Sequence, residues 1–378
     1  MKIGVPKESF NAETRVAISP NVAKKFISLG YEVIMENDAG KGSNFTDKDY
    51  SDVGVKLDKK EEVYKSDILA KINPPTKQEI SLMKEGSVLL SLLFAHSNID
   101  LITQMAEQKI SAFSLDAIPR TSLAQSMDVL SSQANLAGYS AVIQGASQMS
   151  KIFPMLMTSA GTIKPATVVI FGAGVAGLQA IATAKRLGAN VWVSDIRPET
   201  KEQVESLGGK FIEVGGDSTI KTEGGYVKDV SEDFLKKQQE LVSEKVASAD
   251  LVITTALIPG KKAPLLIPDS MLENMNPGAV IVDMAVSQGG NCESSILDKI
   301  VVKNGVKIIG EGNLPSTLAM NASELFAKNI QNFLMHLSEN CAFKWDLEDE
   351  ITAGSLIIKS GEILNKSLKE LIPSKEIA

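Results

Sequence analysis

The stretch that most constrains this chain is "TVVIFGAGVAGLQAIATA", residues 167–184, in which β-branched residues lead into three glycines and then into a helical pattern. By length alone it is nearly sufficient to cross a bilayer. The glycines argue otherwise, because they stand where a strand should turn into a helix, and the charged residues Lys185 and Arg186 follow directly. The stretch therefore predicts a strand, a tight turn and a helix in a soluble or peripheral α/β protein.

The spacing of these glycines predicts a dinucleotide site. Gly172, Gly174 and Gly177 form G-x-G-x-x-G, in which the first glycine permits the turn, the second lets a pyrophosphate approach the backbone, and the third lets helix and strand pack closely. The next strand, "NVWVSD", ends at Asp195, about where a carboxylate that binds the adenosine ribose is expected. Its charge would repel a 2′-phosphate and favours NAD over NADP. Arg197 is able to accept such a phosphate, but we expect it to lie along the adenine or the pyrophosphate.

Strand-like and helical segments alternate along most of the chain, which is typical of parallel sheets with helices on both faces. We predict an α/β protein of two Rossmann-like doubly wound domains with a cleft between them. The first comprises residues 1–135 plus 320–378, and the second, the NAD-binding domain, comprises residues 136–319. A long helix over residues 127–149 is expected to cross between them, and another, starting at an Asn321 cap, to return. The tail "GSLIIKSGEIL" predicts two short strands that join the first domain.

Composition excludes several classes of protein. The net charge of −7 has no basic stripe, which makes nucleic acid an unlikely partner. The two cysteines, Cys292 and Cys341, are far apart and form no CxxC motif, so we expect neither a disulfide framework nor a metal site. The N-terminal "MKIGVPKESF" lacks the apolar core of an export signal. These features fit a cytoplasmic protein with no direct membrane insertion.

Few residues are available for acid–base chemistry. Of the two histidines, His336 has the setting of a helix residue without a catalytic role, whereas His96 follows a strand end and is either a loop residue or a functional one. Lys71 also follows a strand, and Arg15 is able to bind a carboxylate. Each of these cations is more often a simple surface charge. A polar, glycine-rich insert over residues 214–230 predicts a projecting hairpin, a mobile flap or a plain surface loop.

A second polar segment, "IPRTSLAQSMDVLSS" (residues 118–132), follows an apolar strand and should lie at the carboxyl edge of the first sheet, where open α/β sheets bind ligands. Arg120 is suited to a pyrophosphate or a ring carbonyl, and Gln125, Asp128 and Ser131 offer the donors and acceptors that a carboxamide needs. Hydride transfer between two nicotinamides requires such orientation and no acid or base in the redox step. The alternative is an ordinary helix N-terminus with Pro119 and capping serines.

The segments "RTSLAQSMDVLSSQANLAGY", "FGAGVAGLQA", "TTALIPGKKAP" and "GGNCE" resemble the NAD(H)-binding alpha subunit, or domain I, of proton-translocating nicotinamide nucleotide transhydrogenases, and the resemblance covers essentially the whole chain. It implies an NAD(P)+ transhydrogenase, Re/Si-specific, that acts as a subunit of a complex. Hydride would pass directly between NAD(H) here and NADP(H) on a partner subunit, coupled to proton translocation by membrane-embedded subunits. It also implies a homodimer, peripheral on the inner face of the cell membrane.

The resemblance assigns residues by position. The catalytic set is Arg120, Gln125 and Asp128, and Gln125 also reaches toward the NADP(H) component. The cofactor-binding set is Arg120, Thr121, Ser122, Gln125, Asp128, Val129, Leu130 and Ser131 at the nicotinamide end, Gly172, Gly174, Val175, Gly177, Asp195, Ile196 and Arg197 on the adenosine side, and Gly225, Gln238 and Leu257. The insert over residues 214–230 resembles the projecting hairpin of the family, which supports dimer contacts.

The chain also departs from the family pattern. Leu123 stands where a second arginine is frequent, and Glu311 and Thr317 stand where a histidine and an arginine are common. The first departure affects docking of the partner subunit rather than the nucleotide contacts.

Two other functions compete with this one. Alanine dehydrogenases share the two-domain plan, an N-terminal stretch like "GVPKE…RVAISP" and a lysine like Lys71, and their deamination chemistry needs a lysine and a histidine beside the substrate. Their histidine belongs nearer Phe94, two positions from His96, and the Gln125 to Ser131 pattern is foreign to them. A non-catalytic NAD-binding module that regulates a partner is the other alternative.

Overall fold

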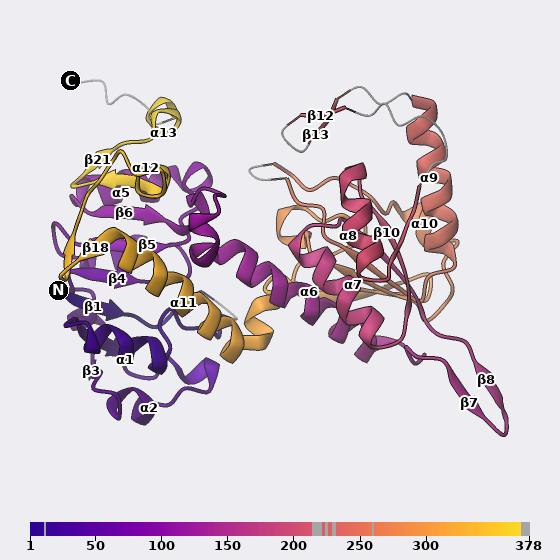
Figure 1. Cartoon of the computed structure of the whole chain (residues 1–378), viewed down its shortest axis with the longest axis horizontal. Helices are drawn as coiled ribbons and strands as arrows, with labels where there is room; N and C mark the ends of the chain where they lie inside the picture. The colour runs from indigo at the N-terminus through magenta and orange to yellow at the C-terminus, as the bar shows by residue number, and fades with distance from the viewer. Residues whose placement is uncertain (11–12, 214–220, 224–225, 229–231, 259–260, 372–378) are drawn as a thin grey trace. The chain divides into compact units, whose positions relative to one another are not determined.

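The computed structural model describes the chain except residues 11–12, 214–220, 224–225, 229–231, 259–260 and 372–378 (Figure 1). The chain forms two compact units: Met1–Gln133 with Pro315–Ala378, and Ala134–Leu314. Helix α6 (Val129–Gln148) begins in the first unit and continues into the second, as its uninterrupted helical pattern predicts.

The first unit is built on an eight-stranded sheet in the order β21-β20-β6-β5-β4-β1-β2-β3. Strands β1 to β6 run parallel, whereas β20 pairs antiparallel with β6 and β21 with β20. The predicted addition of the tail to this sheet is therefore confirmed, with Ser360 and Gly361 forming the turn at positive φ. The strands are β1 (Lys2–Val5), β2 (Glu32–Glu36), β3 (Lys56–Asp58), β4 (Ile68–Ala70), β5 (Val88–Ser91), β6 (Ser111–Ser114), β20 (Leu356–Lys359) and β21 (Glu362–Ile363).

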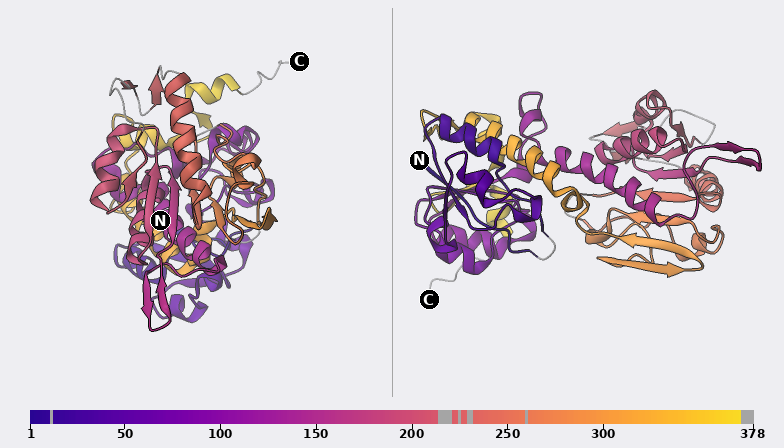
Figure 2. Two further views of the ribbon diagram at one scale, coloured as in Figure 1. Left: turned by 90° about the vertical axis from the view of Figure 1, so that its right-hand side faces the viewer. Right: turned by 90° about the horizontal axis from the view of Figure 1, so that it is seen from below.

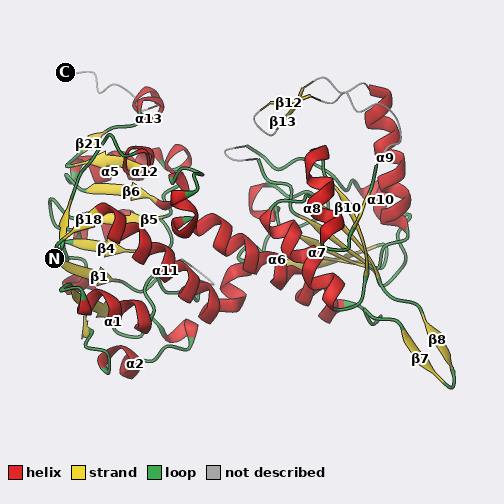
Figure 3. Ribbon diagram, viewed as in Figure 1, coloured by secondary structure: helices red, strands yellow, loops and turns green. Residues whose placement is uncertain are grey.

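Helices flank this sheet (Figure 3). The longest is α11, whose Phe326, Ile330 and Phe333 are buried in the core of the unit. The helices are α1 (Pro20–Ser28), α2 (Asp47–Ser51), α3 (Lys60–Val63), α4 (Lys77–Leu82), α5 (Ile99–Glu107), α11 (Ala319–Leu337), α12 (Glu350–Ser355) and α13 (Lys366–Leu371).

The second unit holds a seven-stranded sheet in the order β11-β10-β9-β14-β15-β17-β16, parallel except for the antiparallel edge strand β16. Its strands are β9 (Thr167–Phe171), β10 (Asn190–Ser194), β11 (Lys210–Phe211), β14 (Leu251–Thr254), β15 (Val280–Asp283), β16 (Lys299–Lys303) and β17 (Val306–Gly310). Its further helices are α7 (Val175–Arg186), α8 (Lys201–Ser206), α9 (Glu232–Ala247) and α10 (Asp269–Leu272).

The six parallel strands of each sheet follow one order, 3-2-1-4-5-6 when numbered along the chain, which is that of doubly wound nucleotide-binding folds. Side chains alternate between two cores along each strand: in β9, Val168 and Ile170 face one core while Val169 and Phe171 face the other. The predicted class of two Rossmann-like α/β domains is confirmed. The strand order reverses between β1 and β4 in the first unit and between β9 and β14 in the second.

The predicted start of α11 is wrong. The helix begins at Ala319, its N-cap position is Leu318, and no side chain caps it. Asn321 lies inside the first turn and donates to Glu324 at 3.4 Å. The Asn-to-Glu spacing is therefore a contact within the helix rather than a cap.

Besides the short antiparallel pair β18 (Ser338–Glu339) and β19 (Ala342–Phe343) that follows α11, two β-hairpins lie outside the main sheets in the part of the chain that the structure describes. Within the 214–230 insert, β12 (Lys221–Glu223) and β13 (Tyr226–Lys228) pair antiparallel, and the remaining residues of the insert lie outside those described. The second hairpin, β7 (Leu156–Thr158) with β8 (Gly161–Ile163), extends away from the sheet of its own unit (Figure 1 and Figure 2). The sequence did not reveal it, because its apolar residues are exposed rather than alternating between core and solvent.

Within the described part of the chain, no helix is both long and apolar enough to cross a membrane.

Candidate functional site

The glycine motif lies at the switch point of the second sheet, directly after β9. Gly172 adopts φ +96°, which a side chain rarely tolerates, and a Cβ on Gly177 would meet the carbonyl oxygen of Gly172 at 1.9 Å. A Cβ on Gly174 would meet nothing within 4 Å. The backbone conformation at Gly172 and the close packing at Gly177 therefore require glycine for the fold. Gly174 faces open space, which leaves the backbone there accessible to a ligand.

The N-terminus of α7 adds an electrostatic reason for a phosphate to bind here. Gly174 occupies the N-cap position, and no side chain caps the helix. The first amides of a helix lack intrahelical partners and carry partial positive charge. The open face at Gly174 together with these amides forms the arrangement that binds a pyrophosphate in dinucleotide folds.

Three loops meet at this carboxyl edge, because β10, β9 and β14 are parallel neighbours. They carry Val175 after β9, Ile196 after β10 and Leu257 after β14, and all three apolar side chains are exposed. Exposed apolar groups around an open turn are suited to the faces of an adenosine.

Asp195 and Arg197 form a tight pair after β10. Arg197 donates from Nε to Oδ1 at 3.0 Å and from Nη2 to Oδ2 at 2.9 Å. Burial of Asp195 acts to raise its pKa, but hydrogen bonds from Arg197 and from the amide of Ala173 outweigh it and lower the pKa. In this structure the guanidinium is thus bound to Asp195, and its place along the adenine or the pyrophosphate stays a prediction.

The loop over residues 118–132 presents its polar side chains unequally. Arg120 and Gln125 are exposed and make no side-chain hydrogen bond or ion pair with any residue that the structure describes. Asp128 precedes α6, and its carboxylate accepts from the amide of Ser131 at 2.9 Å and from the hydroxyl of Ser131 at 2.6 Å. Asp128 therefore caps α6 and orients the Ser131 hydroxyl, while Arg120 and Gln125 remain available to a ligand.

Side chains of helix α11 hydrogen-bond to this loop. Asn329 and Asn332 both donate to the carbonyl oxygen of Ser126, at 2.9 and 3.0 Å, and Ser132 donates to Asn329 at 2.7 Å. These two asparagines were not singled out in the sequence. Their spacing places them one turn apart on the face of α11 toward the loop, but nothing in the sequence indicates what they contact.

The other predicted site residues are placed as follows. The carbonyl oxygen of Thr121 accepts from the amide of Ala124 at 3.1 Å, and Ser122 and Leu130 are exposed. The side chain of Val129 belongs to the core, so a ligand contact at this residue would be to its backbone. Gly225 lies outside the described residues. Gln238 lies in α9, but the structure does not describe its side chain. Leu123 is 65% exposed.

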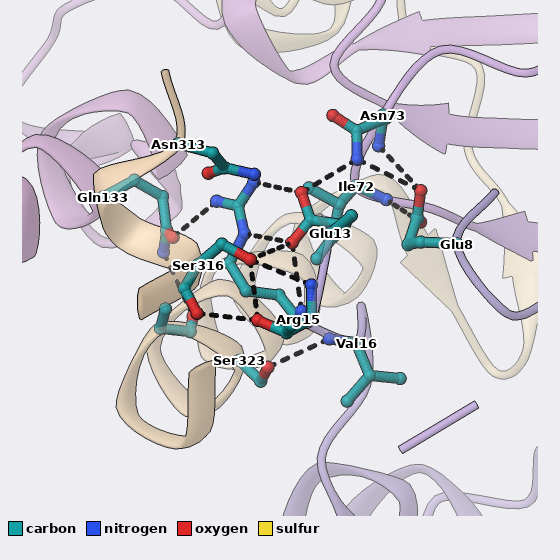
Figure 4. A network of polar contacts seen from close by, with 12 residues as sticks. Glu8, Glu13, Arg15, Val16, Ile72, Asn73, Gln133, Asn313, Ser316 and Ser323 are labelled. Atoms are coloured by element: carbon teal, nitrogen blue, oxygen red, sulfur yellow. Dashed lines mark hydrogen bonds and ion pairs between the residues drawn. The ribbon is translucent and has the colours of Figure 1, made fainter. Parts of the chain in front are cut away.

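A network of polar contacts around the Glu13–Arg15 ion pair joins the segments that follow β1 and β4 in the first sheet (Figure 4). Arg15 donates to Glu13 from Nε at 2.8 Å and from Nη2 at 2.6 Å, and from Nη1 to Gln133 at 2.8 Å. Asn73 also donates to Glu13, at 3.0 Å. Burial of Glu13 would raise its pKa, but the bonds from Arg15 outweigh it and lower the pKa to about 2. Glu13 was not singled out in the sequence, although it lies two residues from Arg15.

Lys71 is fully buried in the same region. Its Nζ lies 3.5 Å from Glu8 and 3.6 Å from Glu79, both of which are buried. These carboxylates balance its charge, although Nζ makes no hydrogen bond with any residue that the structure describes.

The two histidines lie elsewhere in this unit. His96 is exposed and its Nε2 contacts Ser367 of α13 at 2.9 Å. His336 bonds to Asp349, the N-cap of α12, at 2.8 Å. The structural role expected for His336 fits this contact, and His96 is bound to α13 rather than to Lys71 or Arg15.

The buried carboxylate of Asp283 and the amide of Asn291 hold two loops of the second unit by hydrogen bonds. Asp283, at the end of β15, accepts from Thr254, Ala285, Asn291 and Cys292 at 2.9 to 3.1 Å. Asn291 in turn bonds both backbone groups of Ala256 and the carbonyl of Pro264. The loop that carries Leu257 is thereby fixed. A carboxylate that ends a fully apolar strand was the available signal in the sequence.

Known proteins match the chain along its full length. The N-terminal domain model of the alanine dehydrogenase/PNT family matches residues 4–137, and the C-terminal domain model matches residues 141–366. The chain is 49% identical over 379 residues to an NAD(P) transhydrogenase subunit alpha chain of Rhodospirillum rubrum, covering 97% of this chain and 99% of that one.

Solved structures agree with these sequence matches. A transhydrogenase structure from Sinorhizobium meliloti matches with a TM-score of 0.89 at 42% identity, covering 96% of this chain and 100% of that one. An L-alanine dehydrogenase structure matches with a TM-score of 0.83 at 27% identity, covering 99% of each chain.

Proposed function

The chain belongs to the alanine dehydrogenase/PNT family, and from this premise we propose that it is the NAD(H)-binding component of a proton-translocating transhydrogenase. Hydride passes directly between NAD(H) bound here and NADP(H) bound on a partner subunit, and other subunits couple this exchange to proton translocation across the membrane. The chain then lies in the cytoplasm, on the inner face of the cell membrane, through those partners.

The observation that most supports the proposal is a difference in ion pairing between Arg15 and Lys71 on one side and Arg120 on the other. Arg15, which is able to bind a carboxylate, and Lys71, which corresponds to the lysine that deamination needs beside its substrate, are each neutralised by buried carboxylates. Arg120 is exposed and has no ion-pair partner among the described residues. A cation without an ion-pair partner is thus available in the loop, whereas the charges of Arg15 and Lys71 are balanced within the protein.

The residues of the loop then act by orientation. A bound NAD(H) supplies the carbon that gives or accepts the hydride, and hydride transfer needs no acid or base from the protein. Arg120 and Gln125 donate to the nicotinamide end, and Ser131, oriented by Asp128, adds a hydroxyl. Because Arg120 and Gln125 are exposed, they are also accessible to the partner subunit. Holding the ring in a reactive orientation is a large part of what such a site contributes to the rate.

The adenosine and pyrophosphate bind in the second unit. The N-terminus of α7 takes the pyrophosphate, Asp195 takes the ribose hydroxyls, and Val175, Ile196 and Leu257 cover the adenosine. Gly225 and Gln238 remain part of the proposed set on the strength of the resemblance.

We also propose that the chain is a homodimer. Among the described surfaces the β7–β8 hairpin, and not the 214–230 insert that the resemblance suggested, is best suited to the contact. Leu156 and Ile163 form a cross-strand pair in it, and both side chains are exposed, as are those of Met155 and Met157. A solvent-exposed apolar hairpin is typical of an interaction surface.

The decisive experiment mixes the purified chain with the NADP(H)-binding component of a related transhydrogenase and follows reduction of an NAD analogue by NADPH. A parallel assay supplies alanine and NAD without the partner. Hydride transfer that requires both components supports the proposal. Activity on alanine alone would reject it in favour of an alanine dehydrogenase, and NADH binding without any transfer would favour a regulatory NAD-binding module.

Variants of the loop test the mechanism in the same assay. Arg120→Ala and Asp128→Ala should slow hydride transfer more than they weaken NADH binding, by about tenfold or more for the loss of a charged contact. Arg186→Ala removes the same charge at the far end of α7 and should leave the rate unchanged. Equal rates in Arg120→Ala and wild type would exclude an orienting role for the loop.

A further inference from the structure

The carboxylate of Asp195 already accepts as many hydrogen bonds as it has acceptor positions. Oδ2 accepts from the amide of Ala173 at 2.6 Å and from Arg197 Nη2 at 2.9 Å. Oδ1 accepts from the amide of Arg197 at 2.8 Å and from Arg197 Nε at 3.0 Å. A carboxylate has about four lone-pair sites. Two are therefore taken by backbone amides and two by the guanidinium of Arg197.

A ribose diol that binds Asp195 needs two of these positions. The amides of Ala173 and Arg197 are fixed by the glycine turn and by the turn after β10, so they cannot withdraw without a change of the backbone. The Arg197 side chain is 34% exposed, whereas that of Asp195 is 4% exposed. The guanidinium is thus the donor that is free to leave, and the diol and the guanidinium compete for one carboxylate.

The pair also changes how the site responds to a 2′-phosphate. An isolated Asp195 would repel that group strongly, whereas an aspartate paired with a guanidinium presents little net charge. A guanidinium released from Asp195 is a good partner for a phosphate, because it donates two parallel hydrogen bonds. Both effects weaken the preference for a free ribose hydroxyl.

We propose that Arg197 sets the nucleotide selectivity of this site, by holding Asp195 in a neutralised pair that a ribose diol must displace and by lowering the discrimination against a 2′-phosphate. This inference rests on the proposed function, which places NAD(H) at the loops after β9 and β10. If the pair were only structural, its loss would change the binding of NADH and NADPH alike.

The test measures the dissociation constants of NADH and NADPH for the whole chain by fluorescence titration. In Arg197→Ala the ratio of the NADPH constant to the NADH constant should rise by about tenfold, the change expected when one charge-assisted contact is removed. Arg197→Lys should be intermediate, because an ammonium does not bridge both carboxylate oxygens. Arg186→Ala controls for the loss of one positive charge and should leave the ratio unchanged.

The outcomes separate this inference from the proposed function. A ratio that is unchanged or lower in Arg197→Ala, with NADH still bound and transfer to the partner intact, would overturn the role of Arg197 and leave the function standing. Wild-type protein that binds no NADH would overturn both. A higher ratio in Arg197→Ala that is graded through Arg197→Lys supports the inference.

Discussion

Glu13 makes the stability of the first unit depend on pH. Its ordinary pKa of 4.5 falls to about 2 in the fold, because hydrogen bonds from Arg15 outweigh the opposing effect of burial. Between these values the unfolded chain binds a proton and the folded chain does not, so stability rises with pH there. The charged Glu13 therefore contributes roughly 3 kcal/mol above pH 4.5, and this is lost as the pH falls through about 2.

Glu13→Gln should lower the free energy of unfolding at pH 7 by roughly 3–5 kcal/mol, because it leaves Arg15 buried beside a neutral group. Its difference from wild type should shrink as the pH falls from 5 toward 2. Denaturant unfolding at a series of pH values measures this. The control is Glu62→Gln, because the carboxylate of Glu62 is exposed beside Lys65. Its free energy of unfolding should differ little from that of wild type. Parallel pH curves for Glu13→Gln and wild type would show that the pair does not stabilise the unit.

At this scale the sequence predicted residues whose role is local and missed those whose role depends on a distant partner. Gly172, Gly177 and Asp195 lie within one strand–turn–helix unit and its neighbour, so that spacing alone indicated their geometry. Lys71 looked like an available cation, because its balancing residues Glu8 and Glu79 come from other parts of the fold. Whether a charge is free depends on tertiary contacts that periodicity does not contain.

Helix α11 is the element that positions the loop proposed to hold the nicotinamide. The double variant Asn329→Ala/Asn332→Ala removes both donors to the carbonyl of Ser126, and we expect hydride transfer to slow roughly three- to tenfold. NADH affinity should change less, because most of the proposed nucleotide contacts lie in the second unit. Stopped-flow transfer rates and NADH titration, measured on the same preparation, separate the two effects.

Asn321→Ala is the matched control for this element, since Asn321 lies on the same helix and contacts only Glu324 among the bonds described for its side chain. Its transfer rate should equal that of wild type. If the double variant lowered NADH affinity and transfer rate by the same factor, α11 would be a general support of the fold and not a positioning element.

Elements were predictable where burial imposed a pattern. The apolar run of β9 lies between two cores, and the sequence predicted it as a strand. Strands β3 and β16 carry no such pattern, because β3 is three residues long and β16 is an edge strand with exposed Ile300 and Val302. The cap assigned to Asn321 was wrong for a related reason, since polar spacing within a helix imitates a capping motif.

The same strand order occurs in both sheets, and it places the glycine motif, after β9, and the loop over residues 118–132, after β6, at the carboxyl edges of their sheets. The alternation of strands and helices was sufficient to predict this fold class. The 3-2-1-4-5-6 order itself was not predicted, because it depends on which strands pair.

The proposed homodimer is a property of the whole molecule, and the β7–β8 hairpin is where it is best tested. Leu156→Glu/Ile163→Glu places two charges on the exposed cross-strand pair. Since burying unpaired charges in an apolar contact costs several kcal/mol, the dimer dissociation constant should rise by about 100-fold or more. Analytical ultracentrifugation over a range of concentrations measures it.

Ile300→Glu is the control, because Ile300 is 54% exposed on the edge strand of the same unit and lies outside the hairpin. It should sediment as wild type does. The hairpin variant should still bind NADH, since the loops after β9, β10 and β14 are unaffected by it. A hairpin variant that remains dimeric would assign the contact to another surface, and a wild-type chain that is monomeric at all concentrations would contradict the homodimer itself.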